Sequence, residues 1–384
     1  MIVLSASRLY SPQEEIQHPL LFLEDGRISA VGSRDQLEIS PKARRIDLGD
    51  ATLAPGYVDV HMHGGAGLDV MRASAGDLPR LHQFLTQHGV TGYFPTTVAA
   101  ALDQTCSALG RLADAIDAAG KSSTTDGAIP LGIHLEGPFL SHKRRGVHPP
   151  EFLIEPTVTA FDRLWQAARG HVKMLTIAPE IPGALEVIAE AARRKVCVSL
   201  GHSDATLDAA HAGVRAGARH ATHTFNAMRP LDHRDPGLLG EVLTDDRLSA
   251  DIIADGIHVA PEVVKLFLNA KGSDRAVLIT DATAAAGMPD GHYQLGPIQV
   301  EVKDGRCTNN GKLAGSVLTM DAAVRNAAAF ANWSLQDSIR AATLNPARAT
   351  GLSHHGSLVA GAEANIVVLG TQGDVRRTIV RGQV

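Results

Sequence analysis

The stretch that decides the fold is Gly56-Tyr57-Val58-Asp59-Val60-His61-Met62-His63-Gly64-Gly65. Mostly apolar residues lead directly into His-x-His, and glycines follow, as expected for a buried strand that ends in a turn. Because residues i and i+2 of a strand point the same way, His61 and His63 should lie together at its carboxyl end. Neutral imidazole is a common zinc ligand, so the two histidines could hold one ion. In a chain with 18 histidines, this pair alone is weak evidence for a metal.

Beyond this stretch, short apolar segments alternate with helical ones, which is typical of parallel βα units. Eight such units over roughly 250–300 residues fit a (β/α)8 TIM-type barrel. The competing fold is a doubly wound open sheet, but no Gly-x-Gly-x-x-Gly follows the first strand, so nothing supports a dinucleotide site. We therefore predict an α/β protein with a barrel over residues 55–349. Its strands are predicted at 56–60, 93–97, 131–136, 172–177, 196–200, 220–224, 248–253 and 276–281.

Helices are predicted between and after these strands, at 102–119, 185–194, 205–216, 319–331 and 335–342. Ser203 and Asp204 are candidate N-caps of the helix at 205–216, and Gly217 is its candidate stop. The pattern Ser334-x-x-Asp337 predicts a capping box for the last helix. Residues 298–302 and 306–308 predict a hairpin inserted after the eighth strand.

Both ends of the chain contain short strand-like segments. At the N-terminal end these are residues 3–4, 20–23 and 28–31, with a hairpin turn at Glu24-Asp25-Gly26. At the C-terminal end they are residues 365–369 and 377–382. Neither set of strands could bury its apolar face alone. We therefore predict a small β-sandwich domain formed by residues 1–54 together with residues 350–384.

The bulk composition excludes several classes of partner. The net charge of −5 gives no reason to expect nucleic acid or an anionic membrane. No apolar run approaches the roughly 18 residues of a membrane span, and the N-terminal residues lack the pattern of a secretion signal. The three cysteines are scattered, without the spacing of a metal site. Free thiols in a reducing cytoplasm are the simplest interpretation.

Polar residues stand at the carboxyl ends of five predicted strands, where this architecture builds its active sites. Any single histidine here could instead be a core residue that donates to a backbone carbonyl. A buried carboxylate without a partner is costly, so the acidic residues are harder to dismiss. Taken together, the set predicts a metal site. Its members are His61, His63, Glu136, His202, His223 and Asp281.

The sequence also resembles a known family through several stretches in a fixed order. The more specific ones are His134-Leu135-Glu136-Gly137-Pro138-Phe139, Asn226-Ala227-Met228 and Leu313-Ala314-Gly315-Ser316. The others are residues 55–65, 143–148, 201–206, 223–225, 255–259 and 280–283. They resemble the amidohydrolase superfamily and, within it, the deacetylases of N-acetylglucosamine 6-phosphate.

The resemblance implies a metal-dependent hydrolase and assigns roles to individual residues. It implies that Glu136, His202 and His223 bind the main metal ion, while His61 and His63, with Asp281, provide a possible second site. Asp281 matches the catalytic base and acid, and His148 the residue that polarises the acetyl carbonyl. One or two divalent ions per subunit are expected, with zinc favoured over iron, manganese, cobalt or cadmium. The residues that match sugar-phosphate contacts are Val147, His148, Asn226, Ala227, Arg234, His258, Leu313, Ala314 and Gly315.

The resemblance further implies a cytoplasmic homodimer, in which a neighbouring subunit approaches the phosphate, and an amino-sugar phosphate as small-molecule substrate. Without the resemblance, Arg234 would be interpreted as an exposed loop residue paired with Asp235.

Other amidohydrolases, which bridge two metals with a modified lysine after the fourth strand, are an alternative. Residues 176–180 contain no lysine, which disfavours them. An inactive barrel that serves as an interaction scaffold is a second alternative, but it predicts lost ligands, and none is missing.

Overall fold

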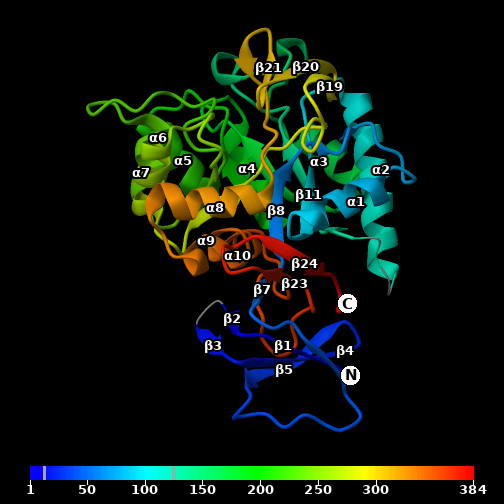
Figure 1. Ribbon diagram of the computed structural model, residues 1–384. Helices are drawn as coiled ribbons and strands as arrows, with labels where there is room; N and C mark the ends of the chain where they lie inside the picture. Colours follow the sequence, from blue (N-terminus) through cyan, green and yellow to red (C-terminus); the bar gives the residue numbers. More distant parts are fainter. Residues whose placement is uncertain (12–13, 123–124, 126) are drawn as a thin grey trace.

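A curled sheet of parallel strands forms the centre of the computed structural model, which describes residues 1–11, 14–122, 125 and 127–384 (Figure 1). Each of the eight predicted strands is present, with small differences in length. Six of them pair in parallel in the order β8-β11-β13-β14-β15-β16, and β17 pairs with β18. The strands are β8 (Tyr57–Met62), β11 (Val90–Thr97), β13 (Ile133–Glu136), β14 (Val172–Ile177), β15 (Cys197–Leu200), β16 (His220–Ala221), β17 (Ala250–Ile253) and β18 (Ala276–Ile279).

Backbone hydrogen bonds join the pair β17-β18 to the longer sheet on both sides. The amide of Thr224, after β16, donates to the carbonyl of Asp251 in β17 over 2.9 Å. The amide of Asp281, after β18, donates to the carbonyl of His61 in β8, also over 2.9 Å. The curled sheet is therefore consistent with a TIM-type barrel, as the βα pattern predicted.

Two strands end earlier than predicted because the backbone turns sharply at their carboxyl ends. Strand β16 stops at Ala221 rather than residue 224, and β18 stops at Ile279 rather than residue 281. Beyond them, His223 and Asp281 have φ values of +29° and +51°. Extended strands require negative φ, so the ladder cannot continue through these residues.

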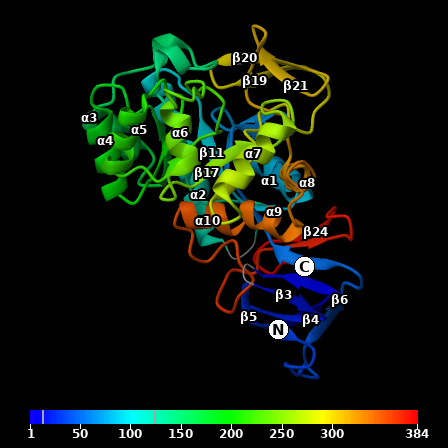
Figure 2. The ribbon, with the colours of Figure 1, turned by 90° about the vertical axis from the view of Figure 1, so that its left-hand side faces the viewer.

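Helices cover the outside of the curled sheet (Figures 1 and 2). The prediction that Ser203 and Asp204 cap the helix after β15 is wrong. That helix begins after Thr206, whose hydroxyl accepts from the amide of Ala209, whereas the Ser203 hydroxyl and the Asp204 amide both donate to Glu180. The outer helices are α1 (Leu78–Gln87), α2 (Leu102–Lys121), α3 (Val158–Ala167), α4 (Ala184–Arg193), α5 (Leu207–Ala216), α6 (Gly237–Thr244), α7 (Pro261–Lys271), α8 (Met320–Ala331), α9 (Leu335–Ala341) and α10 (Leu344–Ala349).

The other predicted helix signals are confirmed. Gly217 is the C-cap of α5, with φ of +131°. The hydroxyl of Ser334 accepts from the amide of Asp337 at the start of α9. Among the described residues, none of the helices is both long enough and apolar enough to cross a membrane.

Strands from the two chain ends form two further sheets, which are drawn below the curled sheet in Figure 1. One sheet has the order β5-β4-β1-β6, and the other has the order β24-β23-β7-β2-β3, so it joins strands from both ends of the chain. A single apolar cluster includes Leu4 of the first sheet and Leu53 and Ile366 of the second. The strands are β1 (Ile2–Ser5), β2 (Arg8–Tyr10), β3 (Glu15–Gln17), β4 (Pro19–Glu24), β5 (Arg27–Ser33), β6 (Arg44–Asp47), β7 (Thr52–Pro55), β23 (Ile366–Leu369) and β24 (Val375–Ile379).

The predicted hairpin after β18 is part of a four-stranded antiparallel sheet that lies over the carboxyl ends of the parallel strands (Figure 1). Its order is β19-β20-β21-β22, with β20 and β21 as the predicted hairpin. Leu295, at the end of β19, packs in an apolar cluster with Val98, which follows β11. The strands are β19 (Gly291–Leu295), β20 (Ile298–Lys303), β21 (Arg306–Asn309) and β22 (Lys312–Leu313).

Replacing Ile366 by alanine should lower the free energy of unfolding by about 2–5 kcal/mol, because it removes buried methyl groups and leaves a cavity between strands from both chain ends. Ile366 is fully buried and pairs with Pro55 on one side and Ile379 on the other. Denaturant unfolding would measure the loss. The matched control is Val359→Ala, at a residue that is 45% exposed, which should change stability by less than about 0.5 kcal/mol. Equal effects of the two substitutions would contradict the prediction.

Candidate metal and catalytic site

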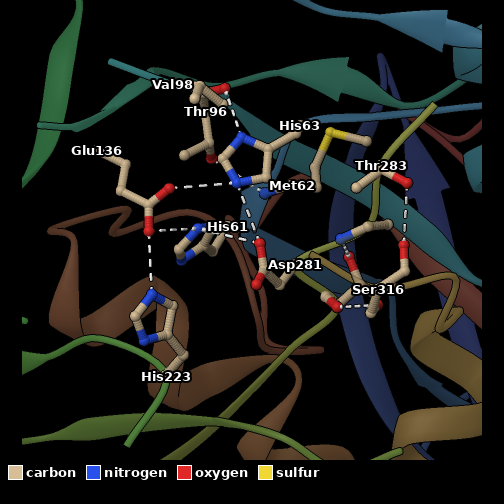
Figure 3. A network of polar contacts seen from close by, with 12 residues as sticks. His61, Met62, His63, Thr96, Val98, Glu136, His223, Asp281, Thr283 and Ser316 are labelled. Atoms are coloured by element: carbon tan, nitrogen blue, oxygen red, sulfur yellow. Dashed lines mark hydrogen bonds and ion pairs between the residues drawn. The ribbon is translucent and has the colours of Figure 1, made fainter. Parts of the chain in front are cut away.

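Two histidines and two carboxylates meet at the carboxyl ends of three parallel strands (Figure 3). His61 and His63 extend from the end of β8 and Glu136 from the end of β13, while Asp281 follows β18. The Nε2 atom of His63 lies 3.0 Å from Oδ1 of Asp281 and 3.3 Å from Oε2 of Glu136. The Nε2 atom of His61 lies 3.4 Å from Oδ1 of Asp281. This arrangement confirms that alternate residues of β8 place both imidazoles on one face.

Glu136 also contacts two histidines that follow other strands of the same sheet. Its Oε1 atom lies 3.1 Å from Nε2 of His202, which follows β15, and 3.0 Å from Nε2 of His223, which follows β16. The two imidazole Nε2 atoms are 3.1 Å apart. Two ring nitrogens this close, both facing one carboxylate oxygen, form a donor set suited to a shared cation.

Three of these side chains lie on strained backbone. His202, His223 and Asp281 have φ values of +47°, +29° and +51°, in or near the left-handed region that residues with a side chain rarely adopt. Such conformations cost of order 1–3 kcal/mol each and persist only where the surroundings enforce them. At each of these turns the backbone leaves the direction of the strand, so that the side chain points into the site.

Backbone groups determine which ring nitrogen of each histidine faces the site. Nδ1 of His63 lies 3.1 Å from the carbonyl oxygen of Thr96, and Nδ1 of His202 lies 2.9 Å from that of Arg144. A carbonyl can only accept, so in the neutral ring each Nδ1 carries the proton and the lone pair is left at Nε2. This is the tautomer that binds a metal through Nε2.

His148 has the opposite tautomer. Its Nδ1 accepts a hydrogen bond of 3.1 Å from the backbone amide of Ala99, so its Nε2 must carry the proton. That N–H group lies 3.6 Å from Oε2 of Glu136 and points into the site. His148, Glu136 and His202 are close enough to surround an ion, but the protonated Nε2 makes His148 a hydrogen-bond donor rather than a ligand.

Electrostatics keep both carboxylates ionised. Burial favours protonation of Glu136, but the surrounding histidines outweigh it and hold the pKa of Glu136 well below its usual range. Burial also opposes ionisation of Asp281, yet His61 and His63 lower its pKa to about 2. For His202, burial dominates and lowers the pKa to about 4, which leaves the ring neutral at pH 7.

The donor set fits a divalent metal ion. Two groups of side chains, His61-His63-Asp281 and Glu136-His148-His202, each bring their donor atoms within 4.8 Å of one another and are buried. Both ring nitrogens of His61 are buried and have no hydrogen-bond partner among the described residues. Buried polar atoms without partners are rare unless an ion or a water satisfies them. Nitrogen and carboxylate donors in this number suit zinc and similar cations.

A cavity of about 150 Å³ opens onto these groups. His258, Asn226 and the Leu313–Gly315 segment line it, as the resemblance implied. Its lining consists of His63, Val98, Glu136, Gly146, Val147, His148, His202, His223, Asn226, Ala227, His258, Asp281, Leu295, Leu313, Ala314 and Gly315. All the residues expected to contact the sugar phosphate therefore line this cavity except Arg234.

Arg234 lies outside this cavity, on the exposed loop before α6. Among the described residues no ion pair joins it to Asp235, which instead binds the side chain of Arg229. Instead, the amide of Arg234 donates to the side chain of Asp232. The described chain therefore does not bring Arg234 to its own site.

Sequence reasoning missed several residues that shape the site. The Ser316 amide donates to the carbonyl of Asp281 over 2.7 Å, and the Ser316 hydroxyl donates to the carbonyl of Thr280 over 2.6 Å, so Ser316 fixes the strained turn (Figure 3). His134 is buried, with its ring centroid 4.6 Å from that of His61. Both residues belong to quoted motifs, but contacts with backbone carbonyls and rings leave no pattern in one sequence.

The comparisons with known proteins agree with this geometry. The family model described as the amidohydrolase family matches residues 52–384. The chain is 36% identical over 380 residues to N-acetylglucosamine-6-phosphate deacetylase of Bacillus subtilis, covering 98% of this chain and 95% of the relative. It is 38% identical over 383 residues to N-acetylgalactosamine-6-phosphate deacetylase of Escherichia coli O157:H7, covering 99% of this chain and 98% of the relative.

Solved structures are similar over the same length. A mutant N-acetyl-D-glucosamine-6-phosphate deacetylase from Mycobacterium smegmatis, in complex with N-acetyl-D-glucosamine-6-phosphate, is 36% identical. It superposes with a TM-score of 0.92, covering 100% of this chain and 98% of that one. On this evidence, the chain belongs to the amidohydrolase family.

Proposed function

We propose that this protein removes the acetyl group from N-acetylglucosamine 6-phosphate, giving glucosamine 6-phosphate and acetate, in amino-sugar catabolism and cell-wall sugar recycling. The observation that carries the proposal is the convergence of Glu136, His202, His223 and Asp281 in one cavity beside the donor His148. Relatives with this activity in their names are similar over nearly the whole chain. The reaction is the hydrolysis of a linear amide.

The cofactor in this proposal is one or two divalent metal ions per subunit, with zinc favoured over iron, manganese, cobalt or cadmium. Glu136, His202 and His223 would hold the main ion, and His61, His63 and Asp281 a second one. When bound, such a cation lowers the pKa of water and withdraws electrons from a carbonyl.

The chain's own residues supply the proton transfers. Asp281, ionised at neutral pH, accepts a proton from the water whose oxygen attacks the carbonyl carbon. It then returns this proton to the nitrogen as the C–N bond breaks, so that the amine leaves neutral, and the acetic acid that remains loses its own proton to solvent to give acetate. His148 donates its Nε2 proton in a hydrogen bond to the carbonyl oxygen, where negative charge develops. A donor in this position typically contributes about 10²–10³ in rate.

The remaining cavity residues hold the sugar phosphate in this proposal. Val147, Asn226, Ala227, His258 and the Leu313–Gly315 segment surround it. Arg234, which is exposed and does not line its own site, would reach the phosphate of the neighbouring subunit in a homodimer. Its guanidinium suits that role because it donates to phosphate oxygens in a fork.

We extend the proposal to the architecture and the cellular location. The curled sheet is a closed (β/α)8 barrel over residues 55–349, and the two terminal sheets form a β-sandwich from residues 1–54 and 350–384. The shared apolar cluster and the backbone hydrogen bonds at both sides of β17-β18 support these assignments. The protein would act in the cytoplasm, where phosphorylated sugars and free thiols are found.

The galactosamine epimer is a second candidate substrate. The relative from Escherichia coli that is named for N-acetylgalactosamine 6-phosphate is 38% identical, no less than the glucosamine relatives. Comparing kcat/KM for both epimers, by release of the free amine, would decide between them. A preference of at least tenfold for the galacto epimer would replace the glucosamine substrate in the proposal.

Asp281→Asn should lower kcat by about 10²–10⁴, because asparagine keeps the size of the side chain but cannot carry the proton. The release of glucosamine 6-phosphate measures the effect, with metal content determined in parallel. Asp246→Asn is the matched control, since Asp246 is exposed and pairs with Arg275 on the surface. An Asp281→Asn enzyme that retains more than about a tenth of wild-type kcat would refute the role of proton carrier.

Removal of metal by a chelator should abolish activity and lower the melting temperature, because a bound ion stabilises the folded state by mass action. Addition of Zn²⁺ should restore both properties. Elemental analysis should find one or two equivalents in the wild type and a loss in His223→Ala. The matched control is His233→Ala, at an exposed loop histidine. Full activity in metal-free protein would contradict the proposed cofactor.

Mixed dimers test the placement of Arg234. Arg234→Ala and Asp281→Asn homodimers should each be nearly inactive, but random exchange of subunits should restore about a quarter of wild-type activity. The mixed dimer has one site with an intact Asp281 and an intact Arg234 of the partner subunit. No recovery after exchange, shown by differently tagged subunits, would mean that Arg234 does not act across the dimer.

A further inference from the structure

Val98 and Leu295 form an apolar wall of the catalytic cavity to which the family resemblance assigns no role. Both line the cavity, and each is only 3% exposed. Val98 follows β11, and Leu295 ends β19 of the inserted sheet. The two residues belong to one apolar cluster, which is separate from the main core. An apolar wall inside a cavity of charged groups calls for an apolar part of the substrate.

The wall lies next to the residues that would bind the scissile carbonyl and the metal ion. The residue after Val98 is Ala99, whose amide holds Nδ1 of His148 at 3.1 Å. Two residues before Val98, the carbonyl of Thr96 holds Nδ1 of His63 at 3.1 Å, and Figure 3 shows Val98 beside this contact. Val98 therefore lies in the part of the site where the acyl group would bind.

A second space lies near the wall. Residues within two positions of Val98 and Leu295 in the chain line this space, which is an open groove of about 600 Å³. Ala100, Gln294 and Gly296 line that groove, but they do not line the catalytic cavity. Val98 and Leu295 themselves line the catalytic cavity and not this groove.

Polar contacts hold the wall in place. The carboxylate of Asp69 accepts from the amides of Gly296 and Met71, over 2.5 and 2.8 Å, and so joins β19 to the segment after β10 (Leu68–Asp69). The amide of Val98 donates to the sulfur of Met71 over 3.1 Å. At Gly296, an added Cβ would lie only 3.1 Å from Cβ of Val98. The segments that follow β11 and β19 therefore pack closely. Val98 and Leu295 cannot move away from the cavity without breaking these contacts.

We propose that Val98 and Leu295 set the length of the acyl group that the enzyme removes, so that acetyl fits and longer acyl groups do not. The proposal rests on the deacetylase function above. With the carbonyl oxygen at His148 and the carbonyl carbon within reach of Asp281, the acyl methyl must point away from both groups and from the sugar. The wall is the apolar surface beside that position.

Glucosamine 6-phosphates with N-formyl, N-acetyl, N-propionyl and N-butyryl groups test the proposal, with amine release giving kcat/KM for each. The wild type should lose at least about tenfold in kcat/KM from acetyl to propionyl and again to butyryl, the scale of one methylene in an apolar pocket. Val98→Ala and Leu295→Ala should each raise the propionyl-to-acetyl ratio by about tenfold or more. Val98→Leu narrows the cavity and should shift preference from acetyl towards formyl.

The matched control is Val300→Ala, which removes the same atoms from the same apolar cluster at a residue that does not line the cavity. It should destabilise the protein without changing the acyl ratio, because a ratio within one variant is independent of the fraction folded. Ratios within twofold of wild type in Val98→Ala, Leu295→Ala and Val98→Leu would overturn the proposal. Wild-type turnover of propionyl equal to that of acetyl would do the same. Lack of turnover of every N-acyl substrate would overturn the deacetylase function itself.

Discussion

The structure depends on keeping two carboxylates ionised in a place from which water is largely excluded. Glu136 and Asp281 are both buried, and an isolated buried charge is too costly to persist. Histidines on neighbouring strand ends compensate them, and a divalent ion would complete the compensation. The left-handed turns at His202, His223 and Asp281 serve this requirement. Backbone strain at these three residues is offset by the charge interactions that they make possible.

The backbone distinguishes histidines that are chemically identical. The carbonyl of Thr96 holds the proton of His63 at Nδ1, which leaves the lone pair of the neutral ring at Nε2, and the carbonyl of Arg144 does the same for His202. The amide of Ala99 makes His148 a proton donor at the same ring atom. A backbone carbonyl at Nδ1 therefore leaves Nε2 able to bind a cation. A backbone amide at Nδ1 instead leaves Nε2 able to donate a hydrogen bond to an oxyanion. The identity of the side chain alone would not specify this division.

The sequence permitted prediction of the parallel strands and of the residues at their ends, because both follow from local periodicity. His-x-His on a strand must share a face, and the carboxyl ends of parallel strands must share an edge. What could not be predicted depends on contacts between distant segments. Ser316 acts through the carbonyls of residues 280 and 281, and Val98 meets Leu295 across almost two hundred residues. The N-cap prediction at Ser203 and Asp204 was wrong because Glu180, on another segment, binds both residues.

The five-stranded terminal sheet has a consequence for the order in which the chain can acquire its structure during translation. Strand β7 lies between β2, from the beginning of the chain, and β23, which is made more than three hundred residues later. A ribosome that adds about 5–20 residues per second leaves one edge of β7 unpaired for many seconds. During that interval the nascent chain presents a free strand edge to its surroundings, which is the feature that chaperones shield and that promotes aggregation.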